Sequence, residues 1–151
     1  MDDKSVKFSR TLSYTSEQMF SLVADIDSYS DFLPFCNISN VQKREQKAEG
    51  EWLEAILGIS YKFIKEQYTS RILLDKKNMQ IKVEQISGPL KYLYNFWNFS
   101  DVEEGCEISC EICFSFKSRF LAMILEPFLM KAGEMMINAF EKRAMEFYDS
   151  N

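Results

Sequence analysis

The sequence predicts an α+β fold in which a curved antiparallel sheet of about seven strands wraps around a long C-terminal helix. Most of the chain alternates apolar and polar residues in runs separated by short turns, which is typical of strands joined as hairpins. From Ser118 onward the apolar residues recur at helical spacing instead. A single helix rarely fills the whole inner face of a concave sheet, so the predicted fold leaves room for a cavity.

The N-terminal part of this fold is predicted as a strand followed by a short helix. Residues 6–14 alternate apolar and polar side chains, which indicates a strand with one buried face. Thr15 and Gln18 have the spacing of a capping box, so a helix is expected to begin there. Residues 25–31 are mostly polar and predict a turn or a short helical piece that leads into the loop at 32–36.

Six further strands are expected to complete the sheet. The segments between them are short, and connections of this length favour antiparallel neighbours. One of the bends is expected at residues 58–60, where the sequence reads Gly-Ile-Ser. The expected strands span residues 38–48, 51–59, 61–74, 78–86, 91–100 and 105–117.

The C-terminal part predicts one long amphipathic helix. Pro127 should kink or restart this helix near Glu126, because proline lacks a backbone donor and clashes with the preceding turn. The apolar stripe of the helix consists of Leu121, Leu125, Phe128, Ala132, Met135, Met136, Ala139, Phe140 and Phe147.

Residues 32–36 are expected to form a loop because of Pro34, although most of their side chains are apolar. Pro34 disfavours a helix and pushes Leu33 toward an extended conformation. Connections on a protein surface usually carry polar residues. We therefore expect this loop to fold over a core, a membrane or a hydrophobic ligand.

Composition limits the classes of function. The 151 residues, 46% of them hydrophobic, suit a single domain spanning residues 1–151, and a 15% aromatic content could line a cavity. The net charge of −5, with scattered basic residues, disfavours DNA or RNA binding. The chain has no histidine, which excludes histidine-dependent hydrolases and most zinc chemistry. We therefore expect no catalytic residues, no metal and no enzyme activity.

The cysteines and the N-terminus predict the compartment. Cys110 and Cys113 lie three apart on a predicted strand and so point to opposite faces, which rules out one shared metal. Reduced core cysteines suit a reducing compartment. The N-terminus lacks a secretory or transit pattern, and the stretch at 120–130 is too short to span a bilayer. We expect a cytoplasmic protein, peripheral at most to the inner membrane.

Several motifs follow one another along the chain in a characteristic order. They are Tyr29 with Phe32-Leu33-Pro34-Phe35-Cys36, Ser87-Gly88-Pro89-Leu90, Leu93 with Trp97-Asn98-Phe99, Phe114-Ser115-Phe116-Lys117-Ser118, and Ala139-Phe140-Glu141-Lys142-Arg143-Ala144. In this order they resemble the motifs of a known family, the coenzyme Q-binding proteins and ribosome-association toxin RatA proteins of the START-like, SRPBCC helix-grip superfamily. The resemblance covers residues 8–148 and departs at Phe35, where many relatives carry tryptophan.

The resemblance implies a helix-grip domain that binds ubiquinone or a similar isoprenoid lipid in an internal tunnel. Such a protein would act as a quinone carrier that supports respiratory electron transport, with the lipid as a bound ligand and no catalytic cofactor. An apolar tunnel suffices physically, because an isoprenoid tail gains roughly 0.8 kcal/mol per CH₂ removed from water. The expected ligand-binding residues are Phe32, Leu33, Pro34, Phe35, Pro89, Leu90, Leu93, Trp97, Leu125, Phe128, Met135, Met136 and Phe140.

Two other classes of function stay open. The resemblance also allows a toxin-like protein that binds the large ribosomal subunit and blocks subunit joining, through a protein contact rather than rRNA. The third class of function is a polyketide cyclase-like enzyme, although no cluster of acid and base residues stands out in the sequence. Mass spectrometry of lipid extracts and co-sedimentation with ribosomes would separate the first two.

Individual features also have simpler interpretations. The stripe of the final helix is compatible with an ordinary core, and Gly88-Pro89 with a plain hairpin turn. Asn95 is either a donor to a ligand headgroup or solvated near a strand end, and Arg143 is expected to snorkel at the surface. We further expect transient membrane contact at the end near Pro127, through the apolar loop and the flanking basic residues Lys117, Arg119 and Lys131.

Overall fold

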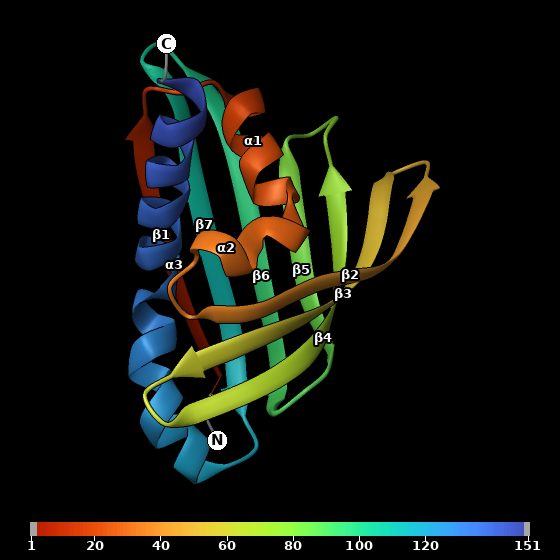
Figure 1. Ribbon diagram of the computed structural model, residues 1–151, viewed down its shortest axis with the longest axis vertical. Coiled ribbons are helices and arrows are strands. Elements are labelled where there is room, and N and C mark those ends of the chain that lie inside the picture. The colour runs from red at the N-terminus through yellow and green to blue at the C-terminus, as the bar shows by residue number, and fades with distance from the viewer. Residues whose placement is uncertain (1–2, 150–151) are drawn as a thin grey trace.

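The computed structural model describes residues 3–149 and contains one seven-stranded antiparallel sheet that curves around a long helix (Figure 1). The strand order is β1-β7-β6-β5-β4-β3-β2, so β1 and β2 form the two edges. This arrangement confirms the predicted fold. The elements are β1 (Lys4–Leu12), α1 (Ser16–Ala24), η1 (Ile26–Ser28), α2 (Tyr29–Phe32), β2 (Cys36–Lys47), β3 (Gly50–Tyr61), β4 (Ile64–Asp75), β5 (Gln80–Ser87), β6 (Leu90–Val102), β7 (Gly105–Phe116) and α3 (Arg119–Tyr148).

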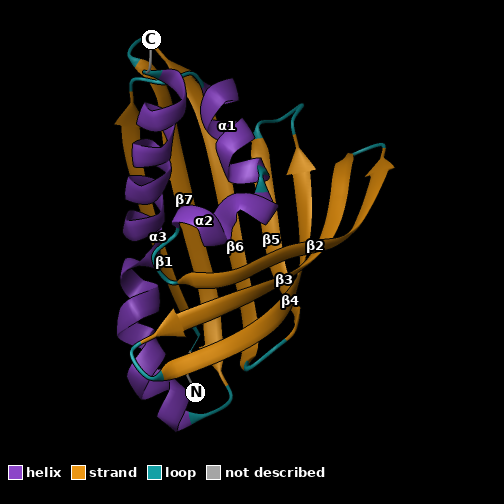
Figure 2. Cartoon of the chain, viewed as in Figure 1, coloured by secondary structure: helices purple, strands orange, loops and turns teal. Residues whose placement is uncertain are grey.

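The helices α1, η1 and α2 carry the chain from one edge of the sheet to the other, across the face that α3 also covers (Figure 2). The predicted capping box begins α1: the Gln18 backbone N–H donates to Thr15 Oγ1 over 3.0 Å, and the Thr15 N–H donates to Gln18 Oε1 over 3.0 Å. Phe20 of α1 packs edge-on against Phe99 of β6, with ring centroids 5.5 Å apart. Phe32 ends α2, so the loop before β2 is shorter than predicted.

The predicted bend at residues 58–60 is wrong. The β3–β4 ladder continues to the pair Tyr61 and Ile64, and the chain reverses at Lys62, which has a φ of 55°. Gly58 instead pairs with Ile38 of β2, next to a register shift in that ladder. A Cβ added there would lie 2.4 Å from Asn37 Oδ1, so a larger residue would displace the Asn37 side chain.

The helix α3 is a single helix of 30 residues, with Pro127 inside it. The Ser118 hydroxyl caps its start by accepting from the Leu121 N–H over 3.2 Å. The expected restart at Pro127 does not occur. Both Pro127 and Met123, whose carbonyl loses its helical donor, are exposed, so water can satisfy that carbonyl.

The core lies between the concave face of the sheet, α3 and the crossing helices. Phe140 of α3 is fully buried at its centre. Its ring packs edge-on against Tyr29, Phe32 and Trp97, with centroid separations of 5.5, 5.3 and 5.6 Å. These contacts join α3, α2 and β6, and they leave space further along α3, toward its N-terminal half.

Candidate ligand-binding site

A cavity of about 80 Å³ lies in that space, between α3, the loop after α2 and the inner face of the sheet. Its wall is formed mainly by aliphatic and aromatic side chains from β3 to β7 and from α3. None of the residues that line it is Asp, Glu, Lys or Arg. Six of the residues expected to bind ligand are in its wall: Leu33, Phe35, Leu93, Trp97, Phe128 and Met136.

Three other expected residues, Phe32, Pro34 and Met135, lie outside this cavity. They line an open hollow on the outer surface, between α2 and α3. Arg143 shares that hollow, with its guanidinium 4.9 Å from the Phe32 ring and 4.6 Å from the Phe147 ring. Its side chain is 21% exposed, so it is held between two aromatic rings instead of extending freely into water.

The remaining expected residues line neither space. Leu90, Leu125 and Phe140 are fully buried in the core, where they support the wall from behind. Pro89 lies in the short connection between β5 and β6, consistent with the simpler interpretation of a hairpin turn. The apolar stripe of α3 thus serves three environments: core, cavity and outer hollow.

Asn95 fits neither of its two expected roles. It lies in the middle of β6 and lines the cavity. Its Nδ2 donates to Cys110 Sγ and to the Glu111 carbonyl, both over 3.1 Å, and its Oδ1 accepts from Trp97 Nε1 over 2.8 Å. The amide is therefore committed to holding Trp97 in the wall. It has no free N–H for a ligand.

Tyr68 of β4 supplies a polar group that the sequence did not single out. It lines the cavity opposite α3, and its hydroxyl has no hydrogen-bond partner among residues 3–149. Burial, with a smaller contribution from the nearby Cys36, raises the pKa of Tyr68 well above its ordinary value. The hydroxyl therefore stays protonated at neutral pH and can donate to a carbonyl or ether oxygen.

Other polar groups of the wall are already paired. Tyr29 donates its hydroxyl to the Val23 carbonyl, and burial raises its pKa well above the ordinary value. The Cys36 thiol donates to the Ile38 carbonyl over 3.3 Å. Neighbouring Cys110 is a free thiol whose pKa burial raises to about 12, so it is an inert neutral group.

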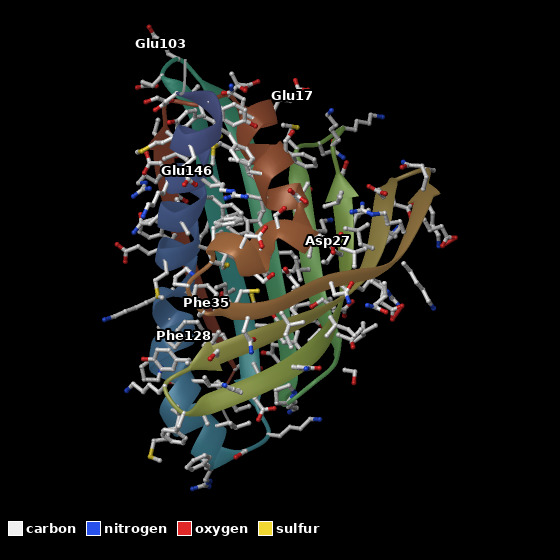
Figure 3. All side chains as sticks on the ribbon, viewed as in Figure 1. Glu17, Asp27, Phe35, Glu103, Phe128 and Glu146 are labelled. Atoms are coloured by element: carbon white, nitrogen blue, oxygen red, sulfur yellow. The ribbon has the colours of Figure 1, made fainter. Side chains whose placement is uncertain are left out.

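Two aromatic rings line the cavity on the side of the loop after α2: Phe128 of α3 packs edge-on against Phe35, with centroids 4.9 Å apart (Figure 3). Tyr61, at the end of β3, packs against Phe128 in a tilted arrangement, with centroids 4.6 Å apart. Phe128 is buried, whereas Phe35 and Tyr61 are half-exposed, so the cluster reaches the surface. We call Phe35, Tyr61 and Phe128 the aromatic gate.

The cavity is small for a lipid. Sites for drug-sized ligands usually measure roughly 300–1,000 Å³, whereas this one measures about 80 Å³. A larger and open depression of about 760 Å³ lies between α1, the β2–β3 hairpin and the β4–β5 turn, but charged side chains such as Arg44, Glu51 and Lys76 line it. Of these two spaces, the smaller cavity is the one whose wall has no charged side chain.

No helix within residues 3–149 is long and apolar enough to cross a membrane. Within the same residues, His, Cys, Asp and Glu side chains form no group of three that could hold a metal ion.

The family model for polyketide cyclase/dehydrase and lipid transport proteins matches residues 12–141. The chain belongs to this family. Among family members, a ribosome association toxin of Rickettsia prowazekii is 34% identical, over 94% of this chain and 97% of its own. The mitochondrial coenzyme Q-binding protein of Dictyostelium discoideum is 32% identical, over 96% of this chain and 71% of its own.

Solved structures share the fold of this chain. An 18 kDa protein of Caulobacter crescentus has a TM-score of 0.79 at 28% identity and covers 99% of this chain and 100% of its own. An aromatase/cyclase from a Streptomyces species has a TM-score of 0.83 at 15% identity and covers 95% of this chain and 94% of its own. At that identity the second likeness concerns the fold alone.

Proposed function

We propose that this family member binds a neutral isoprenoid lipid, such as ubiquinone, in the cavity and carries it in support of respiratory electron transport. The observation that carries the proposal is the wall of the cavity. It holds no charged side chain, and it presents the Tyr68 hydroxyl as a free donor. A fatty acid or a phospholipid headgroup would bring a charge for which this wall offers no partner.

The free energy gained by burying such a ligand favours movement of the aromatic gate. A five-carbon isoprene unit gains about 4 kcal/mol when it leaves water, at about 0.8 kcal/mol per carbon. An aromatic pair such as that of Phe35 and Phe128 contributes roughly 0.5–1.5 kcal/mol beyond its buried area. One isoprene unit therefore outweighs the loss of that aromatic pairing, and a bound lipid would cover the apolar area that the rings expose when they move.

A carrier fits the chemistry of the cavity better than an enzyme does. The wall contains no histidine, carboxylate or lysine. Tyr68 stays protonated and Cys110 stays a neutral thiol, so neither acts as a base at neutral pH. The identity with a coenzyme Q-binding protein over 96% of this chain supports the same conclusion.

Association with the large ribosomal subunit is the second candidate. It is favoured by the 34% identity with a ribosome association toxin over nearly the full length of both proteins. Since the net charge is −5, such a contact would involve ribosomal protein surfaces in preference to rRNA.

The test is to load the protein from vesicles that contain ubiquinone, to reisolate it without detergent, and to identify extracted lipids by mass spectrometry. We expect ubiquinone in the extract and no palmitate when that acid is offered in the same vesicles. A protein that takes up neither lipid and sediments with large ribosomal subunits would overturn the carrier proposal in favour of the second candidate.

A further inference from the structure

Exposed apolar side chains gather at the end of the molecule where α3 begins. Phe63, Phe120, Met123 and Met130 are 69, 52, 67 and 42% exposed. Phe63 comes from the tip of the β3–β4 hairpin, which lies beside the first turns of α3 (Figure 1). Its ring lies 6.2 Å from the ring of Phe120. We call these four residues the apolar end patch.

The patch continues along the outward face of α3. Phe120, Met123, Pro127 and Met130 follow each other at helical spacing, and all four are exposed. The opposite face of the same turns is buried and includes Leu125, Phe128 and Leu129. A helix that covers a core normally presents polar residues to water. An exposed apolar stripe of this kind marks an interaction surface.

Basic residues border the patch. Lys62 adjoins Phe63, Arg119 adjoins Phe120 and Lys131 adjoins Met130, and Lys117 lies two residues before the helix. All four are exposed, and none forms an ion pair with another residue of the described chain. Two carboxylates, Glu126 and Glu134, lie on the same stretch of α3, and the four cations outnumber them. The protein as a whole carries a net charge of −5, so this local balance runs against its overall charge.

We propose that the apolar end patch docks into the surface of a bilayer that contains anionic lipids. Exposed aromatic and methionine side chains with a basic border are what an interfacial helix needs: the apolar groups enter the acyl boundary while the cations meet anionic headgroups. The surface differs from the expected one in that Phe63 of the β3–β4 hairpin belongs to it, and none of the four patch residues comes from the loop at residues 33–35.

Docking in this orientation brings the aromatic gate to the lipid. Tyr61 lies two residues before Phe63, and Phe128 lies on α3 between Met123 and Met130, on the buried side. A lipid that leaves the bilayer could then enter between Tyr61, Phe35 and Phe128 without crossing water. This last step rests on the proposed function, whereas the docking itself rests on the surface alone.

The test is vesicle flotation with phosphatidylcholine alone and with added phosphatidylglycerol, using the full chain and the double variant Phe120→Ser, Met123→Ser. Met145→Ser, Phe147→Ser is the matched control, since both residues lie on α3 and are 48 and 52% exposed at its other end. We expect the first variant to bind the anionic vesicles at least about tenfold more weakly, and the control to bind as the unaltered protein does. Thermal unfolding checks that both variants fold.

Charge reversal tests the basic border separately. Lys131→Glu should weaken binding to anionic vesicles, and the loss should shrink with added salt; Lys142→Glu, exposed further along α3, should have little effect. Background flotation of the unaltered protein with both lipids, or equal losses in patch and control variants, would overturn the docking proposal. Flotation without uptake of ubiquinone would retain the docking and reject the carrier function, and uptake without flotation would do the reverse.

Discussion

Replacing Met136 with tryptophan tests whether the cavity is the ligand site. Met136 lines the cavity, whereas Met135, its neighbour in the chain, lines the outer hollow between α2 and α3. A tryptophan at position 136 should therefore occupy space that the lipid needs, and a tryptophan at position 135 should not. The pair forms a matched experiment, since the same change is made at adjacent positions of one helix.

The size of the cavity sets the expected effect on stability. A void costs about 24 cal/mol per Å³, so an empty cavity of about 80 Å³ costs about 2 kcal/mol, and filling it recovers at most that amount. Inserting a larger side chain into a closely packed region costs typically 1–3 kcal/mol. These two effects nearly cancel at position 136. We expect the free energy of unfolding to change by no more than about 1 kcal/mol.

The measurements are urea unfolding and the ubiquinone content of protein loaded from vesicles. Met136→Trp should fold with nearly unchanged stability and lose its ubiquinone, and Met135→Trp should keep both. A Met136→Trp protein that loses more than about 3 kcal/mol of stability while its folded fraction still carries lipid would show that position 136 is plain core. The ligand would then bind elsewhere, with the outer hollow as the next site to test.

Three further predictions address the wall, its thiol and the backbone. Tyr68→Phe should leave the unfolding midpoint unchanged, because the hydroxyl has no hydrogen-bond partner in the described chain. The same change should weaken ubiquinone retention about tenfold, since it removes the hydrogen-bond donor of the cavity. Equal retention by the two proteins would show that Tyr68 is not part of the ligand site. The Cys110 pKa rises from 9.0 to about 12 on folding, so between these pH values the folded state binds more protons and stability falls as pH rises, by about 1.4 kcal/mol per unit. Urea unfolding at pH 8 to 11, roughly the range that these pKa values span, should show a shallower decline for Cys110→Ala, and identical slopes would contradict the assignment. Gly105→Ala should destabilise the fold by about 2 kcal/mol or more, because its φ is +146° and the new Cβ would lie 2.3 Å from the Leu12 carbonyl oxygen. Gly133→Ala on α3, where the nearest atom is 3.5 Å away, serves as the control and should stabilise by about 0.5–1 kcal/mol.

Much of the fold could be predicted from the sequence, because strands and helices are encoded by local periodicity. The alternation in residues 6–14 and the capping box at Thr15 depend on neighbours in the chain, and both correspond to observed elements. The prediction of a bend at Gly58 was wrong for a related reason. Local sequence shows a glycine, but not whether it makes a turn or lies inside a strand beside a side chain of the neighbouring strand.

The candidate site was predictable only in outline. The stripe on α3 showed which side of the helix is apolar, yet Met135 and Met136 both belong to that side. Which of them meets the cavity depends on where α2 covers the helix, about a hundred residues away in the chain. Tyr68 lies on the inner face of a predicted strand, and alternation alone could have found that face, but not the missing hydrogen-bond partner.

The sequence by itself determined the order of the elements, the buried face of each and the absence of histidine chemistry. Tertiary structure alone decided where packing stops short and leaves a cavity, and which apolar residues stay exposed. Phe63 and Phe120 form one surface only because the β3–β4 hairpin curls back to the start of α3. Periodicity reports the direction of a side chain, whereas distances between remote segments are set by how all the side chains between them pack.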